Sequence, residues 1–161
     1  MLFAKQMKLI EFWFPNDKFN KFWFDKSKDL YIKNNFIDNL IYIEKSNENF
    51  KELNDLEILE KIIYLDQISR NIYRNNKIKI KDNDVKALEM AMYYLNERDW
   101  SNIKLTYLIF YLMPLRHTFK KEYYDKIFEI LNYYKKRDDD KHLFDKFFNV
   151  TQKIYQNIIQ M

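Results

Sequence analysis

A run of polar side chains interrupts an apolar helical pattern in IIYLDQISRNIYR, residues 62–74. Successive helical residues turn by about 100°, so Asp66 and Arg70 fall between two isoleucines, inside or at the rim of the apolar face. A charged group in that position must be paired or hydrogen-bonded, because an isolated buried charge is strongly unfavourable. The spacing therefore predicts a pair between Asp66 and Arg70, one helical turn apart.

Two interpretations of this polar run fit the spacing equally well. In the first, Asp66 and Arg70 form a structural ion pair that ties neighbouring helices together. In the second, the run is the floor of a pocket, where Asp66 orients Arg70 while Arg74 and Gln67 meet an anionic or amide-bearing ligand. Asn71 extends the same polar face. Both interpretations remain open at the level of sequence.

A second candidate for chemistry is His117, which follows Arg116 near the expected end of a helix. A histidine there can act as a general base or contact a phosphate, and a capping or packed histidine is the structural alternative. If the fold brings His117 beside Asp66, the two form an acid/base unit. Asp66 and His117 are therefore the candidate catalytic residues. The predicted ligand-binding set is Asp66, Gln67, Arg70, Asn71, Arg74, Arg116 and His117, and no metal ligands are predicted.

The periodicity of apolar residues predicts that the elements that position these residues are helices along nearly the whole chain. The expected helices cover about residues 3–14, 27–46, 54–74, 84–96, 102–113, 119–136 and 142–159. About seven helices with short connections predict an all-α fold, either a bundle or a stack of antiparallel helical hairpins.

Helix boundaries follow from capping and breaking residues. Asn54 followed by Glu57 predicts a capping box at the start of the third helix. KIKIK at residues 77–81 alternates like a strand, but a strand without a partner is better interpreted as an extended loop. Asp82 or Asn83 is then expected to cap the fourth helix.

Two boundaries concern the region of His117. Ser101 or Asn102 is expected to start the fifth helix, and Pro114 to end or kink it, because proline removes a backbone hydrogen bond. Thr118 is expected to cap the sixth helix. The aromatic segments EFWF and KFWFDK are interpreted as core or helix-joint packing, with base stacking as the alternative.

Composition excludes several classes of site. The 161 residues contain no Gly, which disfavours glycine-rich phosphate loops, dinucleotide-binding turns and nucleophile elbows. No Cys and only two His leave no disulfide framework, no thiolate nucleophile and little for a metal site, so no cofactor is predicted. No apolar run approaches the roughly 18–20 residues of a membrane span. A cytoplasmic location is expected.

The net charge of +4 is distributed unevenly. Residues 1–60 contain 9 basic and 11 acidic groups, whereas residues 61–161 contain 19 and 13. The basic second half permits an anionic partner. A dedicated nucleic-acid domain is usually more basic than this.

The run LDQISRN with Arg74 resembles the signature of the DUF924 family, a group of uncharacterised bacterial-type proteins with a tetratricopeptide-like helical fold. Three segments of the family pattern occur in order: EFWF at 11–14, LDQISRNIYR at 65–74 and YLMPLRHT at 111–118. DNDVKALEMA at 82–91 is similar to the aspartate-led helix of that family. The resemblance covers about residues 8–125 and implies a tetratricopeptide-like stack with no established activity.

The chain departs from the family pattern in two places. His117 is followed by Thr118 and Phe119, where the family usually continues with serine and glutamate. The glycine-bearing C-terminal motif of the family is replaced by a divergent helix within residues 138–161. We expect a single helical domain over residues 1–161, with a family-like core at 8–125.

Three functions follow as hypotheses. The leading one is a non-catalytic scaffold that holds a peptide or protein in a groove between helices, with the last helix able to pair two copies into a homodimer. The second is a small enzyme or ligand-binding protein whose pocket, built on LDQISRN and His117, holds a small anionic, phosphate-bearing ligand. The third is nucleic-acid binding through the basic second half.

Overall fold

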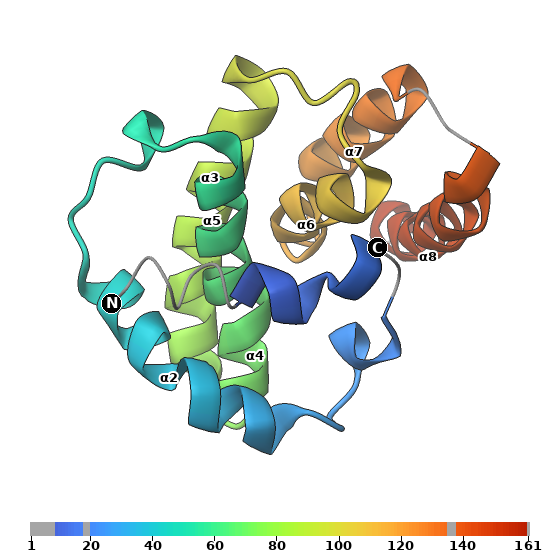
Figure 1. Ribbon diagram of the computed structural model, residues 1–161. Coiled ribbons are helices and arrows are strands. Elements are labelled where there is room, and N and C mark those ends of the chain that lie inside the picture. Colours follow the sequence, from blue (N-terminus) through green and yellow to red (C-terminus); the bar gives the residue numbers. More distant parts are fainter. Residues whose placement is uncertain (1–8, 18–19, 135–137, 161) are drawn as a thin grey trace.

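The computed structural model describes residues 9–17, 20–134 and 138–160, and within these ranges the chain is helical without strands (Figure 1). This confirms the all-α prediction of about seven helices. The helices are residues 9–13, α2 (Asp29–Lys45), the continuous helix α3 (Asp55–Ile62), η4 (Ile63–Ile68) and α4 (Ser69–Ile72), then α5 (Lys77–Glu97), α6 (Leu105–Arg116), α7 (Lys121–Tyr133) and α8 (Lys141–Ile159). Short 3₁₀ turns are η1 (Pro15–Asp17), η2 (Lys21–Phe24), η3 (Phe50–Glu52) and η5 (Asp138–Asp140). Residues 3–8 and 135–136, which belong to predicted helices, lie outside the described residues.

Helix α6 lies at the centre of the fold and contacts α3, α5, α7 and α8 (Figure 1). Its sequence, LTYLIFYLMPLR, is apolar on all sides, and ten of its twelve residues are buried. A helix that is apolar all round must be covered on all sides. The C-terminal end of α6 therefore emerges among the other helices, and this end carries Arg116 and His117.

The helix expected at residues 54–74 is present from Asp55 to Ile72, and its capping box is confirmed. The side chain of Asn54 accepts a hydrogen bond from the Glu57 N–H at 2.9 Å, and the Glu57 carboxylate accepts from the Asn54 N–H at 3.4 Å. An unexpected feature follows: residues Ile63–Ile68 form a π-helical segment, in which hydrogen bonds span five residues instead of four. All six residues of η4 are buried.

The prediction of an extended loop at residues 77–81 was wrong, because α5 already begins at Lys77. Asn76 caps the helix by accepting from the Lys79 N–H at 3.2 Å, so the expected cap at Asp82 or Asn83 was also wrong. Alternating Lys and Ile fits a helix here because the first turns of α5 are largely exposed. The buried face of α5 develops only from Asn83 onward.

Three boundaries around α6 also differ from expectation. α6 begins at Leu105 rather than near Asn102, and Pro114 lies inside the helix, which continues to Arg116. Proline removes only its own N–H from the helix, and the next turn still closes through a bond from the His117 N–H to the Met113 carbonyl at 3.0 Å. The N-cap of α7 is Lys120 instead of Thr118.

The aromatic segments near the N-terminus pack in the core, as the sequence predicted. Trp13 and Trp23 are buried, and the Trp23 indole N–H donates to the Trp13 carbonyl at 2.7 Å. Trp23 also meets Phe110 of α6 edge to face, with ring centroids 4.8 Å apart. These contacts fix η2 against α6 and leave Phe24 51% exposed beside it.

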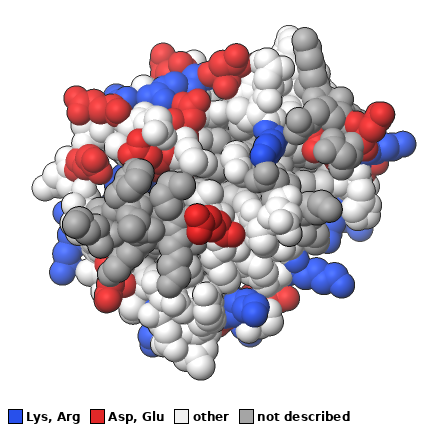
Figure 2. Space-filling model, viewed as in Figure 1, with Lys and Arg blue, Asp and Glu red and all other residues white. Residues whose placement is uncertain are grey.

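Acidic and basic side chains are interspersed on the face shown in Figure 2. Neither sign forms a continuous patch on this face. Among the described residues, no helix has the length and apolar character needed to span a membrane.

Candidate functional site

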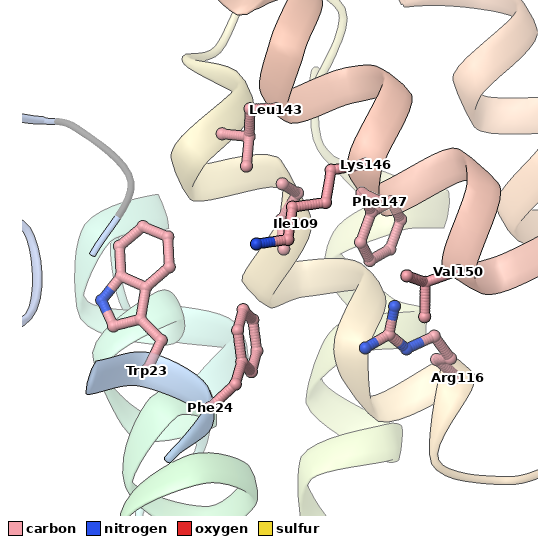
Figure 3. A pocket seen from close by; sticks show the side chains of 8 residues that line it. All are labelled: Trp23, Phe24, Ile109, Arg116, Leu143, Lys146, Phe147 and Val150. Atoms are coloured by element: carbon pink, nitrogen blue, oxygen red, sulfur yellow. The ribbon is translucent and has the colours of Figure 1, made fainter. Parts of the chain in front are cut away.

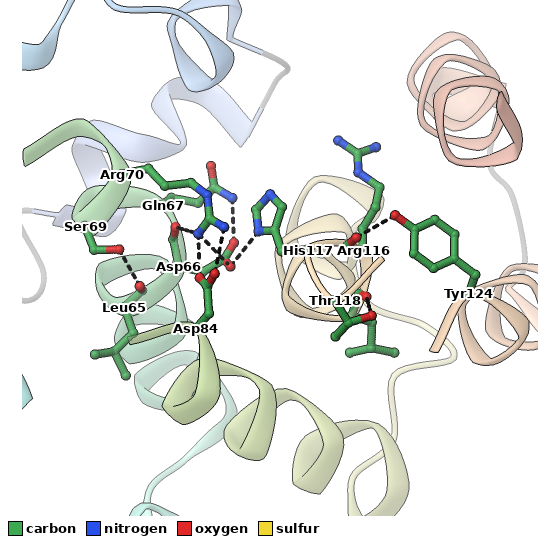
Figure 4. Close-up of polar contacts among 11 residues, drawn as sticks. Leu65, Asp66, Gln67, Ser69, Arg70, Asp84, Arg116, His117, Thr118 and Tyr124 are labelled. Carbon is green, nitrogen blue, oxygen red and sulfur yellow. Dashed lines mark hydrogen bonds and ion pairs between the residues drawn. The ribbon is translucent and has the colours of Figure 1, made fainter. Parts of the chain in front are cut away.

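The fold brings Asp66 of η4 against His117 at the end of α6 (Figure 4). The His117 Nδ1 atom lies 2.8 Å from Oδ1 of Asp66, whose side chain is only 1% exposed. The other carboxylate oxygen, Oδ2, accepts a hydrogen bond from the Gln67 amide at 2.7 Å. The contact between Asp66 and His117 that the sequence left as a possibility is therefore present.

The environment of Asp66 favours its ionised form. Burial acts to raise the pKa of Asp66, but His117, together with Arg70 and Gln67, holds this pKa below its ordinary value. An ionised carboxylate can only accept hydrogen bonds, so Nδ1 of His117 carries the proton. The second ring nitrogen, Nε2, has no hydrogen-bond partner among the described residues, and in Figure 4 it lies on the side of the ring away from Asp66.

The predicted pair between Asp66 and Arg70 forms, but the main partner of Arg70 is Asp84 of α5. The two terminal nitrogens of Arg70 donate to the two carboxylate oxygens of Asp84 at 2.6 and 2.9 Å. One of them also donates to the Asp66 carbonyl at 2.7 Å and lies 3.4 Å from the Asp66 carboxylate. Burial acts to lower the pKa of Arg70, and Asp84 with Asp66 raises it above its ordinary value. Arg70 is a fixed cation that joins three helical segments.

Asp84 was not identified as a site residue, because DND at residues 82–84 was interpreted as a helix cap. A usable signal was present in the sequence. Asn83, Ala87 and Ala91 are buried in α5, so helical spacing continued back from Ala91 places Asp84 beside the buried face. The buried Asn83 donates to the Glu44 carboxylate of α2 at 2.7 Å, which fixes this turn of α5.

The π-helical segment explains how a helix accommodates these charges. The Ser69 N–H donates to the Tyr64 carbonyl, five residues earlier. This wider turn leaves two carbonyls for side chains: the Ser69 hydroxyl donates to the Leu65 carbonyl at 2.5 Å, and Arg70 donates to the Asp66 carbonyl. The backbone of η4 thus takes part in holding the Arg70 guanidinium.

Asp66, Asp84 and His117 have ligand atoms within 4.8 Å of one another, a spacing that suits a divalent cation. The guanidinium of Arg70 already bridges the two carboxylates. We therefore assign no metal to this cluster, since its two carboxylates are engaged by a built-in cation.

Arg74 and Asn71 belong to a second tie, between α4 and α2. Arg74 donates through Nε and Nη2 to the two carboxylate oxygens of Asp29, both at 2.8 Å. Asn71 donates to the same carboxylate at 2.9 Å. The Arg74 side chain lowers the pKa of Asp29 below its ordinary value. Arg74 is thus held by a helix partner.

Arg116 differs from the other arginines of the site, because it has no carboxylate partner among the described residues. Its guanidinium lies 5.0 Å from the centre of the Phe147 ring and 3.5 Å from the Thr151 hydroxyl. Burial lowers the pKa of Arg116 below its ordinary value. Its backbone carbonyl accepts from the Tyr124 hydroxyl at 2.5 Å, which fixes the end of α6 against α7.

These side chains surround a polar pocket of about 200 Å³. Six of the seven predicted binding residues line it: Gln67, Arg70, Asn71, Arg74, Arg116 and His117. Asp66 is buried behind His117. Asp25, Met113 and the two aromatic residues of η2, Trp23 and Phe24, complete the wall, and sequence analysis had placed none of these four in the site.

The family to which these motifs point is confirmed by comparison. No curated protein and no solved structure matches the chain. The family described as "Bacterial protein of unknown function (DUF924)" matches residues 9–161. This match extends beyond residue 125, where the resemblance noted in the sequence ends, and includes the C-terminal helix. The chain, carrying its LDQISRN helix against the histidine at the end of α6, belongs to the DUF924 family.

Proposed function

We propose that the protein binds a small anionic ligand in the polar pocket, at Arg116 and His117, and that the pair Asp66–His117 moves a proton on that ligand. One observation carries this proposal: the buried Asp66 carboxylate holds Nδ1 of His117 and leaves Nε2 without a partner among the described residues, and His117 lines a pocket that Arg116 also lines. A carboxylate that orients a histidine in this way is a common arrangement in general-base catalysis.

Charge pairing selects Arg116 as the ligand-binding cation. Arg70 is neutralised by Asp84 and Asp66, and Arg74 by Asp29. Arg116 keeps its positive charge available to a carboxylate or phosphate, groups that a guanidinium recognises in a bidentate manner. With the anion held there, Nε2 of His117 accepts a proton from the ligand or from a water beside it, and Asp66 stabilises the resulting imidazolium.

The proposal is tested by thermal unfolding with inorganic phosphate. Binding to the folded state raises the melting temperature by mass action. Phosphate should raise the melting temperature of wild type. It should raise that of the control variant Arg98→Gln equally, because Arg98 pairs with Asp55 and does not line either pocket described for this protein. Arg116→Gln should show no stabilisation. An equal response of Arg116→Gln and wild type would contradict an anion site at Arg116.

The scaffold function has one supporting observation of its own. An apolar pocket of about 310 Å³ lies between η2, α6 and α8, where an apolar side chain of a partner protein can dock. This role, the tetratricopeptide-like arrangement that would provide its groove, homodimer formation and a cytoplasmic location stay predictions. Nucleic-acid binding receives less support, because Arg70, Arg74 and Arg98 are paired with carboxylates.

A further inference from the structure

We infer that the ligand is an amphipathic anion, whose charged head binds Arg116 and His117 and whose apolar tail enters the pocket between η2 and α8. This inference rests on the proposed function, because it takes the polar pocket as the site of the head. It adds the chemical class of the ligand: a single alkyl chain of medium length that ends in a carboxylate or a phosphate monoester.

The two pockets share a wall. Trp23, Phe24 and Arg116 line both the polar pocket of about 200 Å³ and the apolar pocket of about 310 Å³. A molecule that contacts these three side chains is therefore placed at the junction and can extend to either side. Their volumes together reach the lower part of the range of about 300–1,000 Å³ that is typical of small-molecule sites.

The apolar pocket is suited to a hydrocarbon tail. Figure 3 shows Trp23 and Phe24 of η2 facing Ile109 of α6 and the side chains of Phe147 and Val150 on α8. None of its lining residues is acidic, and Arg116 and Lys146 are the two charged residues in its wall. An alkyl chain is removed from water there without meeting an unpaired carboxylate.

Arg116 gives the ligand its direction. Its guanidinium lies against the Phe147 ring on the apolar side, while the neighbouring residue, His117, lines the polar pocket. An anionic head at Arg116 therefore has the His117 imidazole on one side and the apolar wall on the other. A neutral alcohol or an alkylammonium ion lacks the charge that Arg116 complements.

The inference is tested by titration calorimetry, which measures how the binding affinity depends on the length of the ligand's alkyl chain. Each methylene removed from water strengthens binding by about fourfold, so octanoate should bind on the order of a hundredfold more tightly than butanoate. Octyl phosphate should bind more tightly than butyl phosphate by a similar factor, because these two also differ by four methylenes, and the comparison of octyl phosphate with octanoate identifies the preferred head. The alcohol 1-octanol should bind at least about tenfold more weakly than octanoate, because it lacks the charge-assisted hydrogen bonds to Arg116.

Substitutions at Val150 distinguish the contribution of the apolar tail to binding from that of the anionic head. Val150 is 41% exposed on α8, so Val150→Trp should fill the apolar pocket, and Val150→Asp should place a carboxylate in it. Val150→Trp should lose the dependence of affinity on chain length while keeping wild-type affinity for inorganic phosphate. Val150→Asp should weaken the binding of both head and tail, because its carboxylate lies in the same wall as Arg116. The control is Val85→Trp, which adds the same side chain at a 64% exposed position of α5 and should behave as wild type.

The outcomes distinguish this inference from the proposed function. If inorganic phosphate binds through Arg116 and octyl phosphate binds no more tightly, the tail site is wrong and the anion site stands. If the long-chain ligands bind but neither Val150 variant weakens them, the tail lies elsewhere and the inference is overturned. If no anion of either length stabilises or binds the protein, both proposals fail. Loss of length dependence at Val150 with phosphate binding intact supports the inference.

Discussion

The Asp66 carboxylate and the His117 imidazole lie 2.8 Å apart although 51 residues separate them in the sequence. The contact joins the π-helical segment η4 to the end of the central helix α6, so it is both a link in the fold and the core of the candidate site. Because Asp66 is buried with all its partners around it, the two roles can be separated only by substitutions that remove one and keep the other.

Asp66→Ala should lower the free energy of unfolding by about 3–5 kcal/mol, because Arg70 and His117 would keep their positions without the buried carboxylate that compensates them. Urea denaturation measures this loss. Asp125→Ala is the matched control, since Asp125 forms an exposed pair with Lys121 on α7, and its removal should cost much less than that of Asp66. Similar losses in the two variants would show that the buried pair contributes no more than a surface one.

Arg70→Ala should create a metal site that the wild type does not offer. Without the guanidinium, the carboxylates of Asp66 and Asp84 and the imidazole of His117 keep three ligand atoms within 4.8 Å. Zinc accepts this combination of oxygen and nitrogen ligands. Zn²⁺ should therefore raise the melting temperature of Arg70→Ala relative to the metal-free variant by several degrees, by mass action, and leave wild type unchanged. The double variant Arg70→Ala/His117→Ala should lose this response.

Arg74→Ala should weaken the fold slightly and leave anion binding intact, because its guanidinium is held by Asp29. We expect a loss of about 1 kcal/mol in the free energy of unfolding, as for other partly exposed ion pairs. Phosphate affinity measured by calorimetry should stay within about twofold of wild type, whereas Arg116→Gln should abolish it. A large loss of phosphate affinity in Arg74→Ala would contradict this expectation and would support the ligand-binding role that the sequence predicted for Arg74.

Glu60 predicts a dependence of stability on pH that is separate from the site. Its side chain is buried in α3, and its Oε1 atom has no hydrogen-bond partner among the described residues. Burial raises the pKa of Glu60 from its ordinary value of 4.5 to about 9. Between these values the folded chain keeps a proton that the unfolded chain has released. The free energy of unfolding contributed by this group is therefore complete below pH 4.5 and falls as the pH rises toward 9.

The measurement is the melting temperature of wild type and Glu60→Gln from pH 5 to pH 9. The slope due to Glu60 is at most about 1.4 kcal/mol per pH unit, and Glu60→Gln should remove it because glutamine carries no titrating proton. Glu89→Gln, at an exposed position of α5, should retain the wild-type slope. A Glu60→Gln profile parallel to that of wild type would contradict the raised pKa.

The sequence predicted most of the helices and six of the residues that line the polar pocket, because both predictions depend on helical spacing and on the rule that buried charges need partners. It could not identify the partners, since these come from other helices: Asp84 for Arg70 and Asp29 for Arg74. Local sequence patterns were misleading where tertiary packing determines the secondary structure. The alternation of KIKIK suggested an extended segment and DND suggested a helix start, but α5 continues through both.

The wide turn at Ile63–Ile68 has a consequence for how this site can be lost. A π-helical turn accommodates one residue more than an α-helical turn, so the direction of every side chain after it depends on the number of residues in the segment. If the same six residues closed as a regular α-helix, every side chain after them would be rotated by about 100° relative to the residues before Ile63. The site therefore depends on the backbone form of η4 as well as on side-chain identity. Among relatives, a chain one residue shorter in this segment can keep its two arginines in place with a regular α-helix, whereas a chain of equal length needs the wide turn.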